Sequence, residues 1–186
     1  MERFDLLKKD IEDQLPKSPL TFELKHAELT LKWLLKLKPE ANEALKIAAL
    51  AHDIERAVTG ITEKDLEDYS KIHEFKKEHA KRSVKITLDM MKKHGYDEQT
   101  LQKVGHLIEA HEEGGDDEQN VLMEADSLAY FDYNVPHYFE RYGKERTKSK
   151  IQFMYKRLSQ KARELVKEIK FPKEIKDIFE EAISEA

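Results

Sequence analysis

The chain has 186 residues, of which 39% are hydrophobic and 38% are charged, and its formal net charge at pH 7 is -5. This length suits one domain that buries its own core, and the acidic balance argues against generic binding to nucleic acids or anionic membranes. The chain has no cysteine, which excludes disulfides and thiolate metal sites, so any metal must be held by histidines and carboxylates. Because no apolar run approaches a membrane span and no signal-peptide core is present, we expect a single cytoplasmic domain over residues 1–186.

Helical periodicity recurs along the whole chain, and no segment alternates with period two, so we expect an all-α fold of about seven helices. The first two helices are predicted over residues 2–13 and 20–37, with Pro16 and Pro19 between them. His26 lies beside an apolar stripe of the second helix. Its side chain is therefore expected to face protein rather than bulk water.

The third predicted helix, residues 44–58, is an apolar stretch that carries His52 and Asp53 side by side in its last turns. Adjacent residues differ by about 100° around a helix axis, so an imidazole and a shorter carboxylate can still converge on one cation between them. A His-Asp dipeptide alone is weak evidence, because chance supplies such pairs in a chain rich in both residues. The evidence for a site must come from its context.

The polar residues 62–72 are compatible with a short helix or a loop, and a long helix is predicted from about His73 to His94. Asp97 is expected to cap the next helix, which carries His111 on its apolar face.

A polar loop over residues 112–119 precedes a helix in which Asp126 lies on an apolar side. Pro136 is predicted to kink or end that helix. Further helices are expected over residues 144–169 and after Pro172.

Two imidazoles and two carboxylates stand beside apolar stripes of these helices: His26, His52, Asp53 and Asp126. An isolated ionised carboxylate on a buried face is costly unless it is paired or metal-bound, which makes Asp126 informative. Imidazole and carboxylate ligands without sulfur suit Mn, Fe, Co, Ni or Zn, or Mg with more water in its shell. The set predicts a divalent-metal site without selecting the element.

The order of these four residues, a histidine, a His-Asp pair and an aspartate on successive helices, resembles the H…HD…D pattern of the HD-domain superfamily of metal-dependent phosphohydrolases. The similarity extends to His79 in His-Ala-Lys-Arg-Ser, to His111 at the end of Ile-x-x-His, and to residues 124–128, which are similar to the E-x-D-x-L segment of many members. It covers roughly residues 20–143, and the helices of residues 144–186 are expected to pack on this part.

The resemblance implies a compact HD-domain bundle in which the four pattern residues hold one divalent ion, with Asp53 able to bridge to a second. In the subfamilies that hold two ions, the additional histidines lie where His79 and His111 lie here, so these two are candidates for a second metal site or for substrate binding. The resemblance also implies hydrolysis of a small phosphorylated metabolite or nucleotide. In that reaction the metal polarises a phosphoryl oxygen and activates water, and Asp53 is the expected ligand and proton acceptor.

Arg56 and Arg82 are the expected phosphate-binding residues, since each follows a motif residue by one helical turn. Either can instead be a surface ion-pair partner. Some superfamily members carry an acidic residue three positions after the motif aspartate. Here that position is Arg56, with Glu55 one place earlier, and this departure argues against the nucleotidase-like subgroup.

Two alternative functions stay open. With six ligands, the set resembles that of superfamily members that are di-iron oxygenases, and a third possibility is a nucleotide-binding module without turnover. The basic run over residues 144–163 can attract phosphates, but a solvated helix face is the favoured interpretation. The other four histidines are assigned structural roles: His73, His94, His106 and His137.

Overall fold

The computed structural model describes residues 2–185, and every regular element within them is helical, which confirms the expected all-α class. The α-helices are α1 (Arg3–Gln14), α2 (Glu23–Leu37), α3 (Glu43–Ala51), α4 (Glu55–Thr59), α5 (Ile72–Lys93), α6 (Glu98–Glu109), α7 (Asp117–Ala129), α8 (Val135–Lys156), α9 (Gln160–Val166) and α10 (Lys173–Ser184). Across residues 2–185, none of these helices combines the length and apolar character needed to cross a bilayer.

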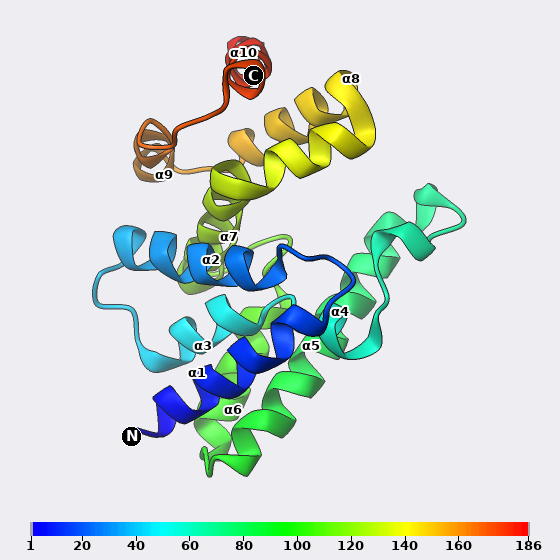
Figure 1. Cartoon of the computed structure of the whole chain (residues 1–186). Coiled ribbons are helices and arrows are strands. Elements are labelled where there is room, and N and C mark those ends of the chain that lie inside the picture. The colour runs from blue at the N-terminus through cyan, green and yellow to red at the C-terminus, as the bar shows by residue number, and fades with distance from the viewer. Residues whose placement is uncertain (1, 186) are drawn as a thin grey trace.

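The helices stack in layers along the long direction of the molecule (Figure 1). Helices α1, α3, α5 and α6 form one end, α8, α9 and α10 form the other, and α2 and α7 lie between them. Helix α2 packs against α7 and α3, α5 packs against α6, and α10 packs against α8. The C-terminal helices therefore rest on the part of the chain that carries the predicted site.

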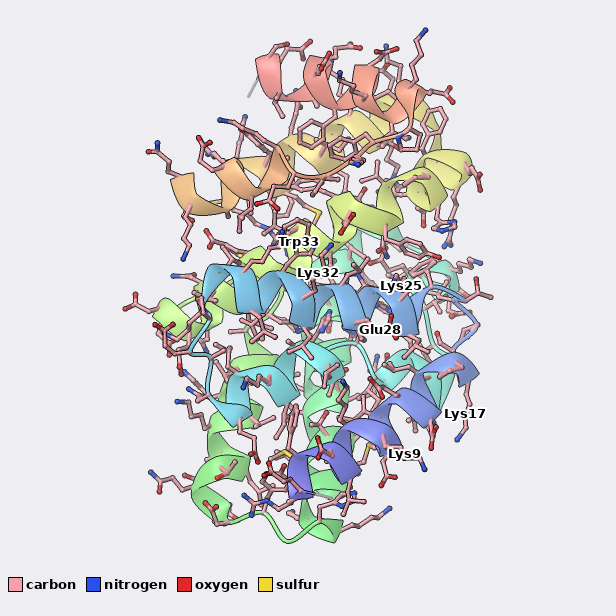
Figure 2. All side chains as sticks on the ribbon, turned by 60° about the vertical axis from the view of Figure 1, so that its left-hand side comes forward. Lys9, Lys17, Lys25, Glu28, Lys32 and Trp33 are labelled. Atoms are coloured by element: carbon pink, nitrogen blue, oxygen red, sulfur yellow. The ribbon has the colours of Figure 1, made fainter. Side chains whose placement is uncertain are left out.

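Helix α2 shows why this stretch is helical and which side it buries. Trp33 and Leu34 are fully buried, whereas Lys25 and Glu28 project to solvent on the opposite side (Figure 2). The Trp33 indole also donates a hydrogen bond to Asp132 Oδ2 at 3.0 Å. An apolar stripe that faces the interior, with charges outside, is the pattern that stabilises a packed amphipathic helix.

The predicted helix over residues 44–58 is interrupted where the motif begins. Helix α3 ends at Ala51 and α4 begins at Glu55, with a tight turn between them. Ala51 O accepts from the N–H of Ile54 at 3.1 Å, and the N–H of Glu55 donates to Ser83 Oγ at 3.3 Å. This contact with α5 takes the place of a helical bond, so His52 and Asp53 lie in a turn between two helices.

The helix predicted over residues 144–169 is confirmed at its start, because the backbone of Gly143 is non-helical (φ 74°, ψ 179°) and kinks α8 there. Its predicted end was wrong, and the total of about seven helices was too low. Helix α7 passes through a π-helical turn, Tyr130–Asn134, directly into α8. Pro136 lies in the first turn of α8, where its missing N–H costs no helical bond. Helix α8 ends at Lys156, and Ser159 caps α9. Residues 60–71 contain only the short 3₁₀ turns Glu63–Asp65 and Tyr69–Lys71.

The packing of α2 predicts how two adjacent leucines differ. Leu34 is fully buried and Leu35 is 37% exposed. We expect Leu34→Ala to lower the free energy of unfolding by about 2–5 kcal/mol, because it removes buried methyl groups and leaves a cavity. The matched change Leu35→Ala should cost less than about 1 kcal/mol. Urea unfolding followed by circular dichroism measures both, and equal losses would contradict this packing.

Candidate metal centre

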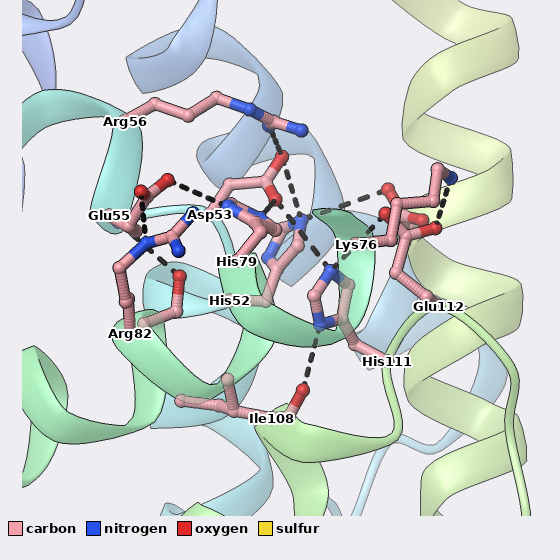
Figure 3. A network of polar contacts seen from close by, with 12 residues as sticks. His52, Asp53, Glu55, Arg56, Lys76, His79, Arg82, Ile108, His111 and Glu112 are labelled. Atoms are coloured by element: carbon pink, nitrogen blue, oxygen red, sulfur yellow. Dashed lines mark hydrogen bonds and ion pairs between the residues drawn. The ribbon is translucent and has the colours of Figure 1, made fainter. Parts of the chain in front are cut away.

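Two of the predicted histidines lie at the ends of helices. His52 directly follows α3, and His111 follows the last turn of α6. The final carbonyls of a helix lack intrahelical partners. His52 Nδ1 donates to Ala49 O at 3.1 Å, and His111 Nδ1 donates to Ile108 O at 2.7 Å (Figure 3). Each ring is thereby fixed with its Nε2 free to face a ligand.

The other two histidines project from within helices and are oriented by side chains. His26 Nδ1, from α2, lies 3.1 Å from Asn134 Oδ1 at the end of the π-helical turn. His79 Nδ1, from α5, lies 2.8 Å from Glu55 Oε2. A neutral imidazole that donates through Nδ1 keeps a lone pair on Nε2, so all four rings are prepared to act as Nε2 ligands.

The first cluster joins His26, His52 and Asp126. His26 Nε2 lies 3.2 Å from His52 Nε2 and 3.0 Å from Asp126 Oδ1. His52 Nε2 lies 3.7 Å from the same carboxylate oxygen. Two Nε2 lone pairs that face one another this closely need a proton or a cation between them. Ligand bonds of about 2.1 Å that meet near a right angle span about 3.0 Å, so these donors fit a divalent ion.

The second cluster joins Asp53, His79 and His111. Asp53 Oδ1 lies 2.8 Å from His79 Nε2 and 3.7 Å from His111 Nε2. Its other oxygen, Oδ2, lies 3.7 Å from His52 Nε2. Asp53 therefore belongs to two groups that could each hold an ion, one with His26 and His52 and one with His79 and His111. All six predicted metal residues come together here.

The carboxylates of the centre are ionised despite their burial. Burial opposes ionisation of Asp53, but the Arg56 guanidinium and His52 hold its pKa well below the usual value. Contacts with His26 and His52 likewise hold the pKa of Asp126 well below its usual value, although burial opposes its ionisation. Burial also disfavours the charged form of His52, yet Asp53 and Asp126 raise its pKa to about 9. The two acids thus attract positive charge into the space between the rings.

His111, which belongs to the second cluster, differs from His52 in charge. Burial lowers the pKa of His111 to about 4, so its ring is neutral at pH 7. A neutral imidazole is the form that binds metal. His111 is therefore ready to act as a ligand without losing a proton.

The two predicted phosphate-binding arginines lie in different places. Arg56 Nη1 contacts Asp53 Oδ2 and lies 3.4 Å from Glu23 Oε1, in the wall of a cavity of about 140 Å³ that opens beside the clusters. Arg82 instead donates from Nε to Glu55 Oε1 at 2.7 Å and is not part of that wall. Arg56 thus lies in the cavity beside Asp53, whereas Arg82 holds Glu55.

A family model for a domain of unknown function, DUF4202, matches residues 4–179. The chain belongs to this family. No curated protein and no solved structure matches the chain. The DUF4202 match includes every helix that contributes to the two clusters, from α2 to α7.

The DUF4202 domain also places residues in the cavity that the sequence did not single out. Glu112 follows His111, and its carboxylate accepts from Lys76 Nζ at 2.6 Å. Lys150 and Arg157, from the basic run read as a solvated face, also line the cavity. His137, assigned a structural role, stacks on Phe22 in the same wall with ring centroids 5.5 Å apart.

Helical spacing was the one available signal for the α8 residues. Lys150, Met154 and Arg157 are four and three residues apart, which places them on one face of a helix. That spacing could not say which face of α8 turns toward the histidines. The tertiary packing of α8 decides this.

Because Asp53 belongs to both groups that could hold an ion, the geometry predicts two bound ions per chain. We expect two Mn²⁺ or Co²⁺ ions per wild-type chain by equilibrium dialysis, and one in His111→Gln, because that change removes a ligand of the second cluster only. Asp53→Ala should weaken both sites.

The matched control is His106→Gln, because this exposed histidine of α6 pairs with Asp116 at 2.7 Å, away from the clusters. It should bind as the wild type does. Bound metal should also raise the melting temperature, since it binds the folded state. Two ions retained by His111→Gln would contradict the assignment.

Proposed function

We propose that this DUF4202 protein is a metal-dependent phosphohydrolase of the HD type that acts on a small phosphorylated metabolite or nucleotide. One observation carries the proposal. Four histidines hold their Nδ1 atoms on fixed acceptors and direct Nε2 toward two carboxylates, one of which is shared between both clusters. Histidines that ligate metals typically donate the N–H of their other ring nitrogen to a carbonyl or carboxylate in this way.

The ligands of a first divalent ion would be His26, His52, Asp53 and Asp126, and those of a second would be Asp53, His79 and His111. When bound, such ions supply Lewis acidity toward phosphoryl oxygens and lower the pKa of water to near neutrality. The pKa of Asp53 is held low, so its carboxylate stays ionised. We therefore assign Asp53 as a bridging ligand and place no proton transfer on it.

The charge of the cavity supports an anionic substrate. Five cationic side chains and four carboxylates line it: Arg56, Lys76, Arg141, Lys150 and Arg157, with Asp53, Glu63, Glu112 and Asp126. The carboxylates Asp53 and Asp126 would be neutralised by bound ions. Arg157 Nη2 lies 3.8 Å from Asp126 Oδ2, so one guanidinium stands beside each cluster to offset phosphate charge.

Replacing Asp53 tests the proposed activity directly. We expect the wild type to release phosphate from at least one member of a panel of phosphomonoesters, nucleotides and cyclic nucleotides supplied with Mn²⁺, Co²⁺ or Mg²⁺. Asp53→Ala should abolish this release while leaving the helical circular dichroism nearly intact, because both clusters lose a ligand. Asp89→Ala, an exposed aspartate of α5, is the control and should retain full activity.

Three outcomes would overturn the hydrolase. Retained turnover in Asp53→Ala would remove the assigned ligand from the reaction. Two bound irons with oxygen consumption and no phosphate release would favour the oxygenase. Tight nucleotide binding with no product across the panel would favour a binding module.

The two arginines predict different kinetic effects. Arg56→Ala should lower kcat/KM by about tenfold to a hundredfold, because a charge-assisted contact in the cavity is worth about 1.5–3 kcal/mol. Arg82→Ala should act only through Glu55 and His79, with loss of the second ion and recovery at higher metal concentration. Kinetics at two metal concentrations separate the two effects. Recovery of Arg56→Ala by added metal would contradict its role on the phosphate.

A further inference from the structure

The cationic side chains of the cavity wall differ in the partners that they contact. Arg56 contacts Asp53 and Glu23, and Lys76 pairs with Glu112. Arg157 donates to Glu112 O at 2.7 Å and to Ser127 Oγ at 2.9 Å. These three side chains are held in place by the protein itself.

Lys150 differs from these three, because it makes no hydrogen bond or ion pair with any residue in the described range 2–185. Arg141 also lacks such a partner in that range, but it is exposed and lies over the Tyr142 ring, 4.8 Å from its centroid. Its Nζ lies 5.8 Å from the centroid of the Tyr130 ring, and its side chain lines the cavity. Burial, together with the nearby Lys76, lowers the pKa of Lys150 to about 8. A desolvated ammonium without a counter-ion is unfavourable unless a ligand supplies the missing negative charge.

The position of Lys150 separates it from the arginine beside Asp53. Lys76 and Glu112 lie on one side of the histidines, and Arg56, Glu55 and Arg82 lie on the other (Figure 3). Lys150 lies on α8, and Met154 and Arg157 continue the same face of that helix into the cavity. Arg56 enters the same cavity from α4, where it contacts Asp53. A ligand that fills the cavity would therefore meet Lys150 on the α8 wall and Arg56 beside Asp53.

We propose that Lys150 binds a second anionic group of the substrate, a carboxylate or phosphate separated by several bonds from the phosphoryl group at the metal centre. This inference rests on the proposed function, since it takes the phosphoryl group to lie at the clusters. It makes the preferred substrate a bis-anion and Lys150 a residue that determines specificity.

Matched pairs of non-hydrolysable phosphonates test the inference by binding alone. Phosphonopropionate and 4-phosphonobutyrate carry a terminal carboxylate, and propylphosphonate and butylphosphonate lack it. Isothermal titration of the Mn²⁺-loaded wild type should show that the carboxylate improves affinity about tenfold in at least one pair, as expected for a charge-assisted contact. In Lys150→Met this preference should fall below about twofold, while affinity for the phosphonate that lacks the carboxylate stays unchanged.

Two further variants control for charge and folding. Lys150→Arg should keep the preference, because it retains the positive charge. Lys148→Met removes a lysine of the same helix that instead pairs with Glu181 and Glu185 at 2.7 Å, and it should bind as the wild type does. Lys150→Gln provides a second neutral variant if Lys150→Met folds poorly by circular dichroism.

Failure of this inference is distinguishable from failure of the proposed function. Equal binding of both members of every pair, an unchanged preference in folded Lys150→Met or Lys150→Gln, or no phosphonate binding by the metal-loaded wild type would overturn the role of Lys150. Phosphonate binding with the expected preference, but no phosphate release from any substrate, would leave that role in place and remove only the hydrolase.

Discussion

The Asp53 carboxylate is the interaction on which the arrangement of this centre depends. One of its oxygens faces His79 and His111, and the other faces His52 and the Arg56 guanidinium. A buried carboxylate is costly when isolated, and here three kinds of positive or hydrogen-bonding partner offset that cost. Without Asp53 the two groups of histidines would have no common ligand. The turn between α3 and α4, which places this side chain, is therefore as important as the histidines themselves.

The orientation of the rings follows from two simple devices. His52 and His111 each bond the carbonyl three residues earlier, a partner that is available only because each helix is ending. His26 and His79 sit within continuous helices, whose carbonyls are already used, and so they need side-chain acceptors. Asn134 and Glu55 supply these. The helix ends and the two polar residues together orient the four histidines so that each Nε2 atom faces the carboxylates of Asp53 and Asp126.

Much of this centre could be predicted from the order of residues along the chain, and the remainder could not. The six predicted metal residues follow from the resemblance to the H…HD…D pattern, and Arg56 from its place one helical turn after the His-Asp pair. The structure brings these seven residues together. The break at Asp53 was missed because it involves a contact between the Glu55 N–H and Ser83, which are 28 residues apart in the sequence, and local propensity does not report such a contact. The part of α8 before the kink at Gly143 was missed because Pro136, interpreted as a helix breaker, is equally compatible with a first turn.

The π-helical turn between α7 and α8 connects the metal centre to the wall that faces it. An i→i+5 turn shifts the phase of the residues that follow, and such turns are frequent at functional sites. Here Asp126 precedes the turn, Asn134 ends it while bonding His26, and Lys150 and Arg157 follow on α8. The proposed metal ligands come from residues 26–126, whereas Lys150, a cavity lysine with no ion pair in residues 2–185, comes from α8. Under the proposed function, the metal ligands and the residue proposed to determine specificity therefore lie in different parts of the chain.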